Sequence, residues 1–152
     1  MLPLARAVEL AAHNVSSGGG PFGAVIVMPD GAAVEGVNRV TRDNDPTAHA
    51  EVVAIRAAAT HLASYDLRGC TLYSSCEPCP MCCAAALWAR LDRVVYAADR
   101  HDAAAAGFDD SAFYALFEQP SGTWPTPVQQ DAIGERLAPF RAWQEFDGRT
   151  EY

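Results

Sequence analysis

The sequence predicts an α/β protein with one mixed β-sheet that has helices on both faces. Three observations predict this class: apolar residues at helical spacing open the chain, a hairpin pattern follows, and helical and strand-like segments then alternate. The chain has 152 residues, of which 50% are hydrophobic and 20% charged. This length and composition suit a single domain over 1–152 with a buried core.

The first elements are a helix and a hairpin. Apolar residues recur every three or four positions over 4–15, and the glycines of 16–21 end this helical pattern. Two short runs rich in β-branched residues, 23–28 and 32–37, flank the turn signal Pro29-Asp30-Gly31. These runs predict two antiparallel strands.

Helices and strands are expected to alternate after the hairpin. The expected helices are 46–62, 79–89, 111–118 and 133–146, with Pro78 at the start of the second and Pro139 a possible break in the last. The expected strands are 70–74 and 93–97, and 121–127 is expected to be a loop.

Charge and targeting signals narrow the function classes. The formal net charge is −8 and the chain has no run of basic residues, which disfavours nucleic acid as a partner. No apolar run is long enough to cross a membrane, and the N-terminus does not have the pattern of a signal peptide. We therefore expect a cytoplasmic protein with no membrane partner.

Four of the five cysteines fall within eight positions. They are Cys76, Cys79, Cys82 and Cys83, and Cys70 lies in an expected strand. An odd number of cysteines without an export signal is a poor disulfide framework, so this cluster favours metal or redox chemistry.

Two segments together predict a zinc site: Thr47-Ala48-His49-Ala50-Glu51 and Pro78-Cys79-Pro80-Met81-Cys82. One imidazole and two thiolates suit Zn²⁺, and three protein ligands leave the fourth position open for water, as in catalytic sites. Zinc lowers the pKa of such a water, which makes a nucleophile available at neutral pH. We therefore predict one zinc ion per subunit, bound by His49, Cys79 and Cys82.

Glu51 is expected to move protons and not to bind the metal. It lies two positions after His49, and side chains at this spacing point about 200° apart on a helix. Either segment alone is weak: His-x-Glu is common at helix starts, and Cys-x-x-Cys also occurs in redox pairs and structural zinc sites. Together they form the pattern typical of zinc-dependent nucleobase deaminases.

Further segments resemble the bacterial guanine deaminases of the cytidine deaminase superfamily. The segments are Pro21-Phe22-Gly23-Ala24, Asn44-Asp45-Pro46-Thr47, Trp88-Ala89-Arg90, Ala106-Gly107-Phe108-Asp109-Asp110 and the final Glu151-Tyr152. The resemblance implies a three-layer α/β/α fold with a central mixed sheet of five strands. It also implies hydrolysis of guanine to xanthine and ammonia by a homodimer in which about 120–152 is swapped onto the partner.

The resemblance also implies roles for individual residues. Asp110 would join Glu51 in catalysis, and the ring would contact Asn38, Ala50, Phe22, Trp88 and the partner's Tyr152. Each has a plainer interpretation: Asn38 as a turn residue, Asp110 as a helix cap, Phe22 and Trp88 as packing, and Tyr152 as a frayed end. Asp109 is expected to cap the helix that follows.

Other functions remain open at this stage. A related deaminase could act on guanosine, cytosine, ammeline or adenosine in tRNA, and the negative charge disfavours the last of these. A non-catalytic zinc module is a hypothesis from another class, and it would require a fourth protein ligand, for example Cys76 or Cys83.

Overall fold

The computed structural model describes residues 2–152, which form two compact units, 2–114 and 115–152. The first unit contains one mixed sheet with the strand order β2-β1-β3-β4. Its strands are β1 (Gly23–Val27), β2 (Ala33–Val37), β3 (Thr71–Cys76) and β4 (Arg93–Ala98). β1 is antiparallel to both of its neighbours, whereas β3 and β4 are parallel.

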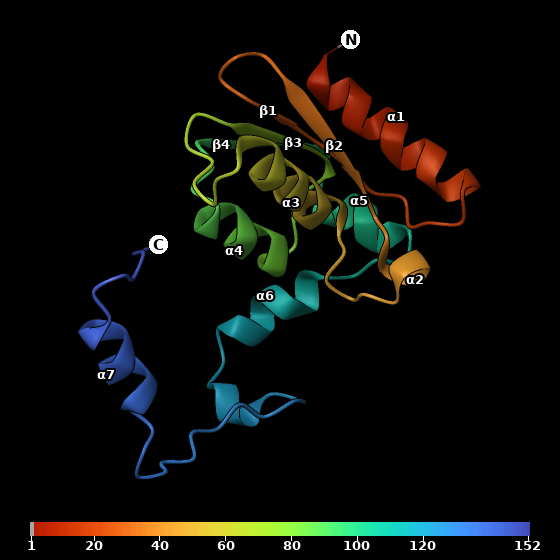
Figure 1. The fold of residues 1–152 in the computed structure, drawn as a ribbon. Helices are drawn as coiled ribbons and strands as arrows, with labels where there is room; N and C mark the ends of the chain where they lie inside the picture. The colour runs from red at the N-terminus through yellow and green to blue at the C-terminus, as the bar shows by residue number, and fades with distance from the viewer. Residues whose placement is uncertain (1) are drawn as a thin grey trace. The chain divides into compact units, whose positions relative to one another are not determined.

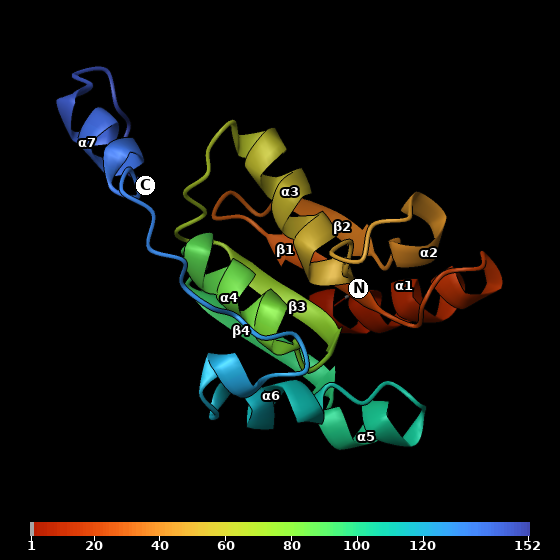
Figure 2. The same cartoon turned by 90° about the horizontal axis from the view of Figure 1, so that it is seen from below.

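Helices cover both faces of this sheet (Figures 1 and 2). α1 (Pro3–Ser16) packs on β1 and β3, and α3 (Ala50–Leu62) packs on β2 and β1 from the opposite face. α4 (Pro80–Trp88) lies beside α3 on that face. The remaining helices are α2 (Val40–Asp43), α5 (Arg100–Ala105), α6 (Ser111–Phe117), the 3₁₀ turn η1 (Ser121–Thr123) and α7 (Ala138–Glu145).

Two glycines let the helices approach the sheet closely. A Cβ at Gly23 would lie 2.4 Å from the Ala7 carbonyl oxygen of α1. On the other face, a Cβ at Gly36 would lie 2.3 Å from the Ala50 carbonyl oxygen of α3. Both distances are shorter than van der Waals contact, so no larger residue fits without moving a helix backbone. Half of the buried residues in the core cluster around α3 and the sheet are therefore alanines, and the others are larger residues such as Ile26 and Leu72.

The class expected from the sequence is confirmed, and several details are corrected. The described residues contain a sheet of four strands, not the five that the resemblance implied, because the segment after β4 is helical. α2 and α5 were not expected. The four strands lie within two residues of their expected bounds.

Three helix starts differ for local reasons. The helix expected over 46–62 begins at Ala50, because Asp45 accepts a hydrogen bond from the Thr47 backbone in a turn and His49 is extended. Prolines occupy the first turn of α4 and of α7, where the missing N–H costs nothing. The proline at the start of α4 is thus Pro80 and not Pro78, and Pro139 is the second residue of α7 instead of a break within a longer helix.

None of the helices within 2–152 is both long enough and apolar enough to span a membrane.

We predict that Gly36→Ala destabilises the first unit, because the added methyl group meets the backbone of α3. Overpacking of this kind costs about 1–3 kcal/mol, which urea denaturation followed by circular dichroism measures. Gly134→Ala is the matched control, since a Cβ there meets no atom within 4 Å. An unchanged urea midpoint for Gly36→Ala would show that the sheet and α3 are not in tight contact.

Candidate active site

The topology brings the N-termini of α3 and α4 to one edge of the sheet. β2 and β3 are both antiparallel to β1, so they are parallel to each other and end at the same edge. α3 follows β2 through α2, and α4 follows β3 directly, so each helix begins near the end of its strand. His49 is the residue before α3, and Cys79 is the residue before α4. The two zinc segments therefore meet although they are far apart in sequence.

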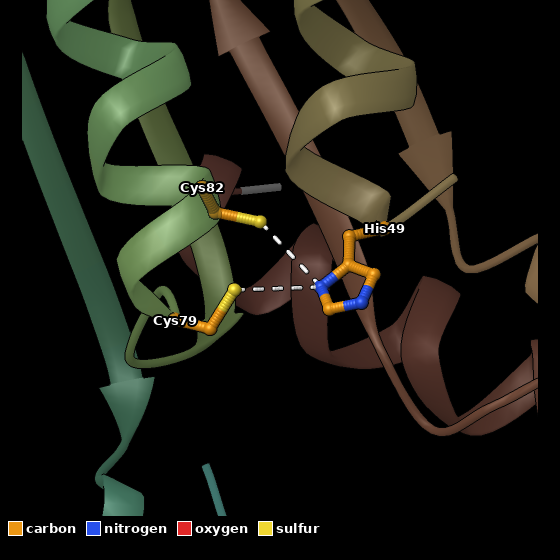
Figure 3. Close-up of side chains that lie close together, drawn as sticks. All are labelled: His49, Cys79 and Cys82. Atoms are coloured by element: carbon orange, nitrogen blue, oxygen red, sulfur yellow. Dashed lines mark hydrogen bonds between the residues drawn. The ribbon is translucent and has the colours of Figure 1, made fainter. Parts of the chain in front are cut away.

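The three expected metal ligands form a compact group (Figure 3). Nδ1 of His49 lies 3.6 Å from the sulfur of Cys79 and 3.6 Å from the sulfur of Cys82. All three donor atoms lie within 4.8 Å of one another. A tetrahedral zinc with ordinary Zn–N and Zn–S bond lengths has an N···S edge of about 3.6 Å. One imidazole nitrogen facing two sulfurs at that distance fits a bound zinc ion.

The electrostatics of the group favour the thiolate form of Cys79, which is the form that binds metal. His49 and Cys79 are N-cap residues whose side chains accept no hydrogen bond from their helices, so first-turn N–H groups and the helix dipole face the site. The contact with Cys82, aided by His49, lowers the pKa of the Cys79 thiol to about 4. The contact with the Cys79 sulfur raises the pKa of His49.

Glu51 lies in the first turn of α3 and is only 5% exposed. Its Oε1 accepts a hydrogen bond of 2.9 Å from the Ser74 hydroxyl, and the Cys82 thiol lies 3.4 Å from its Oε2. Burial raises the pKa of the Glu51 carboxyl. One oxygen is thus anchored on β3 while the other faces the metal ligands, an arrangement suited to carrying protons.

Asn38 follows β2 at the same edge of the sheet and is buried. Its backbone N–H donates to the Phe22 carbonyl, and its Oδ1 accepts from the Val40 N–H. The buried Asn14 amide of α1 donates to the backbone carbonyls of Asn38 and Gly20, both at 2.8 Å. These bonds fix the start of the loop that carries Asn38.

Asp110 lies just before α6 and carries a buried carboxylate oxygen that has no hydrogen-bond partner among the described residues. Burial raises the pKa of this carboxyl, and the Cys79 thiolate acts in the same direction. Asp109 makes the local turn, since its carboxylate accepts from both the backbone and the hydroxyl of Ser111. An unpaired buried oxygen of this kind is expected where a substrate or water supplies the missing partner.

The remaining expected site residues lie in different parts of the structure. Phe22 packs edge-to-face on Phe108 with ring centroids 5.1 Å apart, and Ala50 is fully buried at the start of α3. Trp88 is 69% exposed at the far end of α4, six residues or about 9 Å along the helix from Cys82. Tyr152 belongs to the second unit, where its ring packs edge-to-face on Trp143.

The remaining cysteines lie outside the metal group. Cys70 is fully buried beside β3, and the Cys76 thiol points to the Asp99 carbonyl. The Cys83 thiol contacts the Pro78 carbonyl and the Tyr114 hydroxyl. Within 2–152, the group that could hold a metal contains only His49, Cys79 and Cys82. A closed site with four cysteine or histidine ligands therefore has no support.

The residues that hold the site in place were not expected from the sequence. Ser74 anchors Glu51, and Ser75 accepts the Gly23 N–H. Two adjacent serines at the buried end of an apolar strand were the available signal, because buried hydroxyls need partners. Asn14 lies on an otherwise ordinary amphipathic helix and gave no such signal.

A match to a known protein family identifies the class of this protein. Residues 3–98 match the family described as the cytidine and deoxycytidylate deaminase zinc-binding region. The chain belongs to this family of zinc-dependent deaminases.

Individual relatives show which members of this family the chain resembles. The chain is 53% identical to the guanine deaminase of Bacillus subtilis (strain 168), over 98% of this chain and 96% of the relative. The crystal structure of guanine deaminase from Bacillus subtilis matches with a TM-score of 0.95, 54% identity and coverage of 99% and 96%. A tRNA-specific adenosine deaminase of Haemophilus influenzae is 38% identical over 88% of this chain and 78% of the relative. The expectations of a hydrolytic deaminase and of a zinc cofactor are confirmed.

We predict that Cys82→Ser loses the metal whereas Cys83→Ser keeps it. A serine hydroxyl is a poor ligand for zinc compared with a thiolate, and the Cys83 thiol points to Pro78 and Tyr114 instead of to the metal group. Zinc measured by atomic emission should fall well below the amount of about one ion per chain for the first variant alone. Equal zinc loss in both variants would place Cys83 in the metal site.

Proposed function

We propose that this protein is a zinc-dependent hydrolase that converts guanine to xanthine and ammonia. The observation that carries the proposal is the group of His49, Cys79 and Cys82 with the buried Glu51 carboxyl beside it. The choice of guanine rests on the high identity to a relative named as a guanine deaminase over almost the whole chain.

The chain's own residues account for the movement of protons. A zinc ion held by the three ligands would activate a water molecule for attack on the ring carbon that carries the amine. Glu51 accepts and returns protons, since burial raises the pKa of its carboxyl and so makes it a better base than an exposed glutamate. Ser74 keeps the carboxyl in one orientation throughout. Asp110 assists from the other side, where its unpaired oxygen accepts a hydrogen bond from the substrate.

The ring is bound by residues around the same sheet edge. Because Oδ1 of Asn38 already accepts from Val40, its NH₂ group is left to donate to the base. Phe22, held edge-on by Phe108, contacts the ring, whereas Ala50 is fully buried beside His49 and supports the site from behind. We place Trp88 outside the ring pocket of its own subunit because it lies at the far end of α4.

We predict that Glu51→Gln abolishes guanine turnover without loss of zinc or fold. The amide is isosteric and still accepts the Ser74 hydrogen bond, but it cannot carry a proton, and loss of a general acid–base costs about 10²–10⁴-fold in rate. Ammonia release from guanine is the measurement, with zinc content and circular dichroism as controls. Full activity in this variant would refute the role of Glu51.

A panel of guanine, guanosine, cytosine, ammeline and adenosine tests the substrate in the wild-type protein. Turnover of another ring amine with none of guanine would overturn the proposed substrate but not the proposed reaction.

The likeness to a tRNA-specific deaminase makes tRNA the second candidate substrate. The net charge of −8 disfavours it, because tRNA binding draws on clustered basic residues. Tight binding of tRNA in a low-salt gel-shift assay would favour it.

We also propose that the protein works in the cytoplasm as a homodimer in which the second unit covers the partner's active site. The five cysteines are free thiols, which suits a reducing compartment. The second unit exposes a row of apolar side chains on and beside α7: Leu137, Phe140, Trp143 and Phe146. The first unit exposes Leu87 and Trp88. Exposed clusters of large apolar side chains are usually buried by a partner. Exchange of the second unit between two subunits would bury the exposed clusters of both units.

We predict that deletion of Thr150 to Tyr152 removes activity but leaves zinc binding and thermal stability intact. Mixing two inactive variants shows whether the C-terminal residues that complete a site come from the same chain or from the partner. In a swapped dimer, a truncated chain paired with a Glu51→Gln chain forms one complete site, since the truncated chain supplies Glu51 and the other supplies the tail. An exchanged one-to-one mixture should then regain about a quarter of wild-type turnover. No recovery in a mixture shown to contain heterodimers would refute the swap.

A further inference from the structure

A ring of side-chain contacts outside the catalytic groups links the metal-binding loop to the segment that carries Asp110. Glu77 lies two residues before Cys79, and Arg100 begins α5. Oε1 of Glu77 accepts from Nε and Nη2 of Arg100 at 3.1 and 2.6 Å. Oε2 accepts from the Arg100 backbone N–H at 2.9 Å. The side chains are only 15% and 31% exposed, so the pair is sheltered from water.

Tyr114 closes this ring. The guanidinium carbon of Arg100 lies 3.8 Å from the centroid of the Tyr114 ring, within the range of a cation–π interaction. The Tyr114 hydroxyl donates a hydrogen bond of 2.7 Å to the carbonyl of Pro78, the residue before Cys79. Glu77, Arg100, Tyr114 and Pro78 thus form a closed set of contacts, which we call the clamp.

The clamp matters because little else holds the Asp110 segment. Within 2–152, neither α5 nor α6 packs extensively on a strand or on another helix. Other side-chain attachments among the described residues are the Phe22–Phe108 ring contact, the bond from the Cys76 thiol to the Asp99 carbonyl and the contact of the Cys83 thiol with the Tyr114 hydroxyl. Asp110 lies directly before α6 and precedes Tyr114 by four positions, so Tyr114 anchors the chain about one helical turn away from it.

We propose that Arg100 and Tyr114 are positioning residues that fix Asp110 relative to the zinc ligands. Neither touches the metal group: Tyr114 acts through the Pro78 carbonyl, and Arg100 acts through Glu77. The inference rests on the proposed function, because it assumes that Asp110 contacts the ring undergoing deamination.

The least disruptive test is Tyr114→Phe, which keeps the ring under Arg100 and removes only the hydroxyl. Asp110 then loses one of its few anchors, and a displacement of reacting groups by about 1 Å costs up to about 10²-fold in rate. We expect kcat for guanine to fall about tenfold with zinc content unchanged. Tyr96→Phe is the matched control, since the Tyr96 hydroxyl is on β4 and makes no hydrogen bond within 2–152.

Two further readouts separate positioning from general stability. In an Asp110→Asn background, Tyr114→Phe should add little to the loss of kcat, because both changes act through the same group. Hydrogen exchange followed by mass spectrometry should become faster over 100–114 and stay unchanged over 23–76. Arg100→Lys should behave like Tyr114→Phe, because a lysine keeps the charge but not the two-pronged, stacked geometry.

The outcomes distinguish this inference from the proposed function. If the wild-type protein is inactive on guanine, the proposed function fails while the exchange measurement still tests the clamp. If Tyr114→Phe leaves exchange over 100–114 unchanged, or its effect on kcat adds fully to that of Asp110→Asn, the clamp does not position Asp110. Loss of zinc from Tyr114→Phe would also overturn the proposal, because the clamp would then act on Cys79.

Discussion

The site depends on two helix N-termini meeting at one edge of the sheet. β2 and β3 are parallel with β1 between them, so the helices that follow them start side by side. His49 and Cys79 occupy N-cap positions, where a side chain projects beyond its helix and first-turn N–H groups favour negative charge. Once the register of the sheet is set, the backbone alone brings an imidazole within reach of two thiols. The metal then adds free energy to an arrangement that the strand order has already made.

Close packing against the sheet turns this approximate meeting into a defined geometry. α3 can pack this close to the sheet only because Gly36 has no side chain, and Ala50 and Ala54 form the contact. This short distance between helix and sheet brings Glu51 to the hydroxyl of Ser74 on β3, which anchors its carboxyl. A helix raised by even one methyl group would separate these atoms and leave two buried polar groups without partners, at a cost of about 1–3 kcal/mol each. The same glycine therefore serves both the core and the chemistry.

The strands and the metal ligands could be predicted because their signals are local. Alternation and turn residues mark the strands, and the ligand types at two separate segments mark the zinc site. The helix starts were less accurate, since the side chain of Asp45 competes for the backbone at Thr47 and delays α3 to Ala50. Asn14 and Arg100 gave no local signal, and the pair of buried serines that includes Ser74 did not show which group it binds. Each of the three acts through hydrogen bonds to a distant segment, and a sequence does not show such pairings. The fifth strand came from the resemblance alone, and the described residues form four.

Charge balance explains why so many acidic groups can share this small space. Cys79, Cys82, Glu51 and Asp110 each carry a proton that can be lost. Burial raises the pKa of both carboxyls, and the Cys79 thiolate acts in the same direction. Acidic groups that lie close together cannot all be ionised without a compensating cation, because their negative charges repel. A divalent ion held between the thiolates offsets that repulsion and permits ionised carboxyls, whereas its loss would drive protons onto them. The three candidate zinc ligands and the two carboxyls therefore form one electrostatic unit, and the proposed clamp on Asp110 would also fix the distance over which this coupling acts.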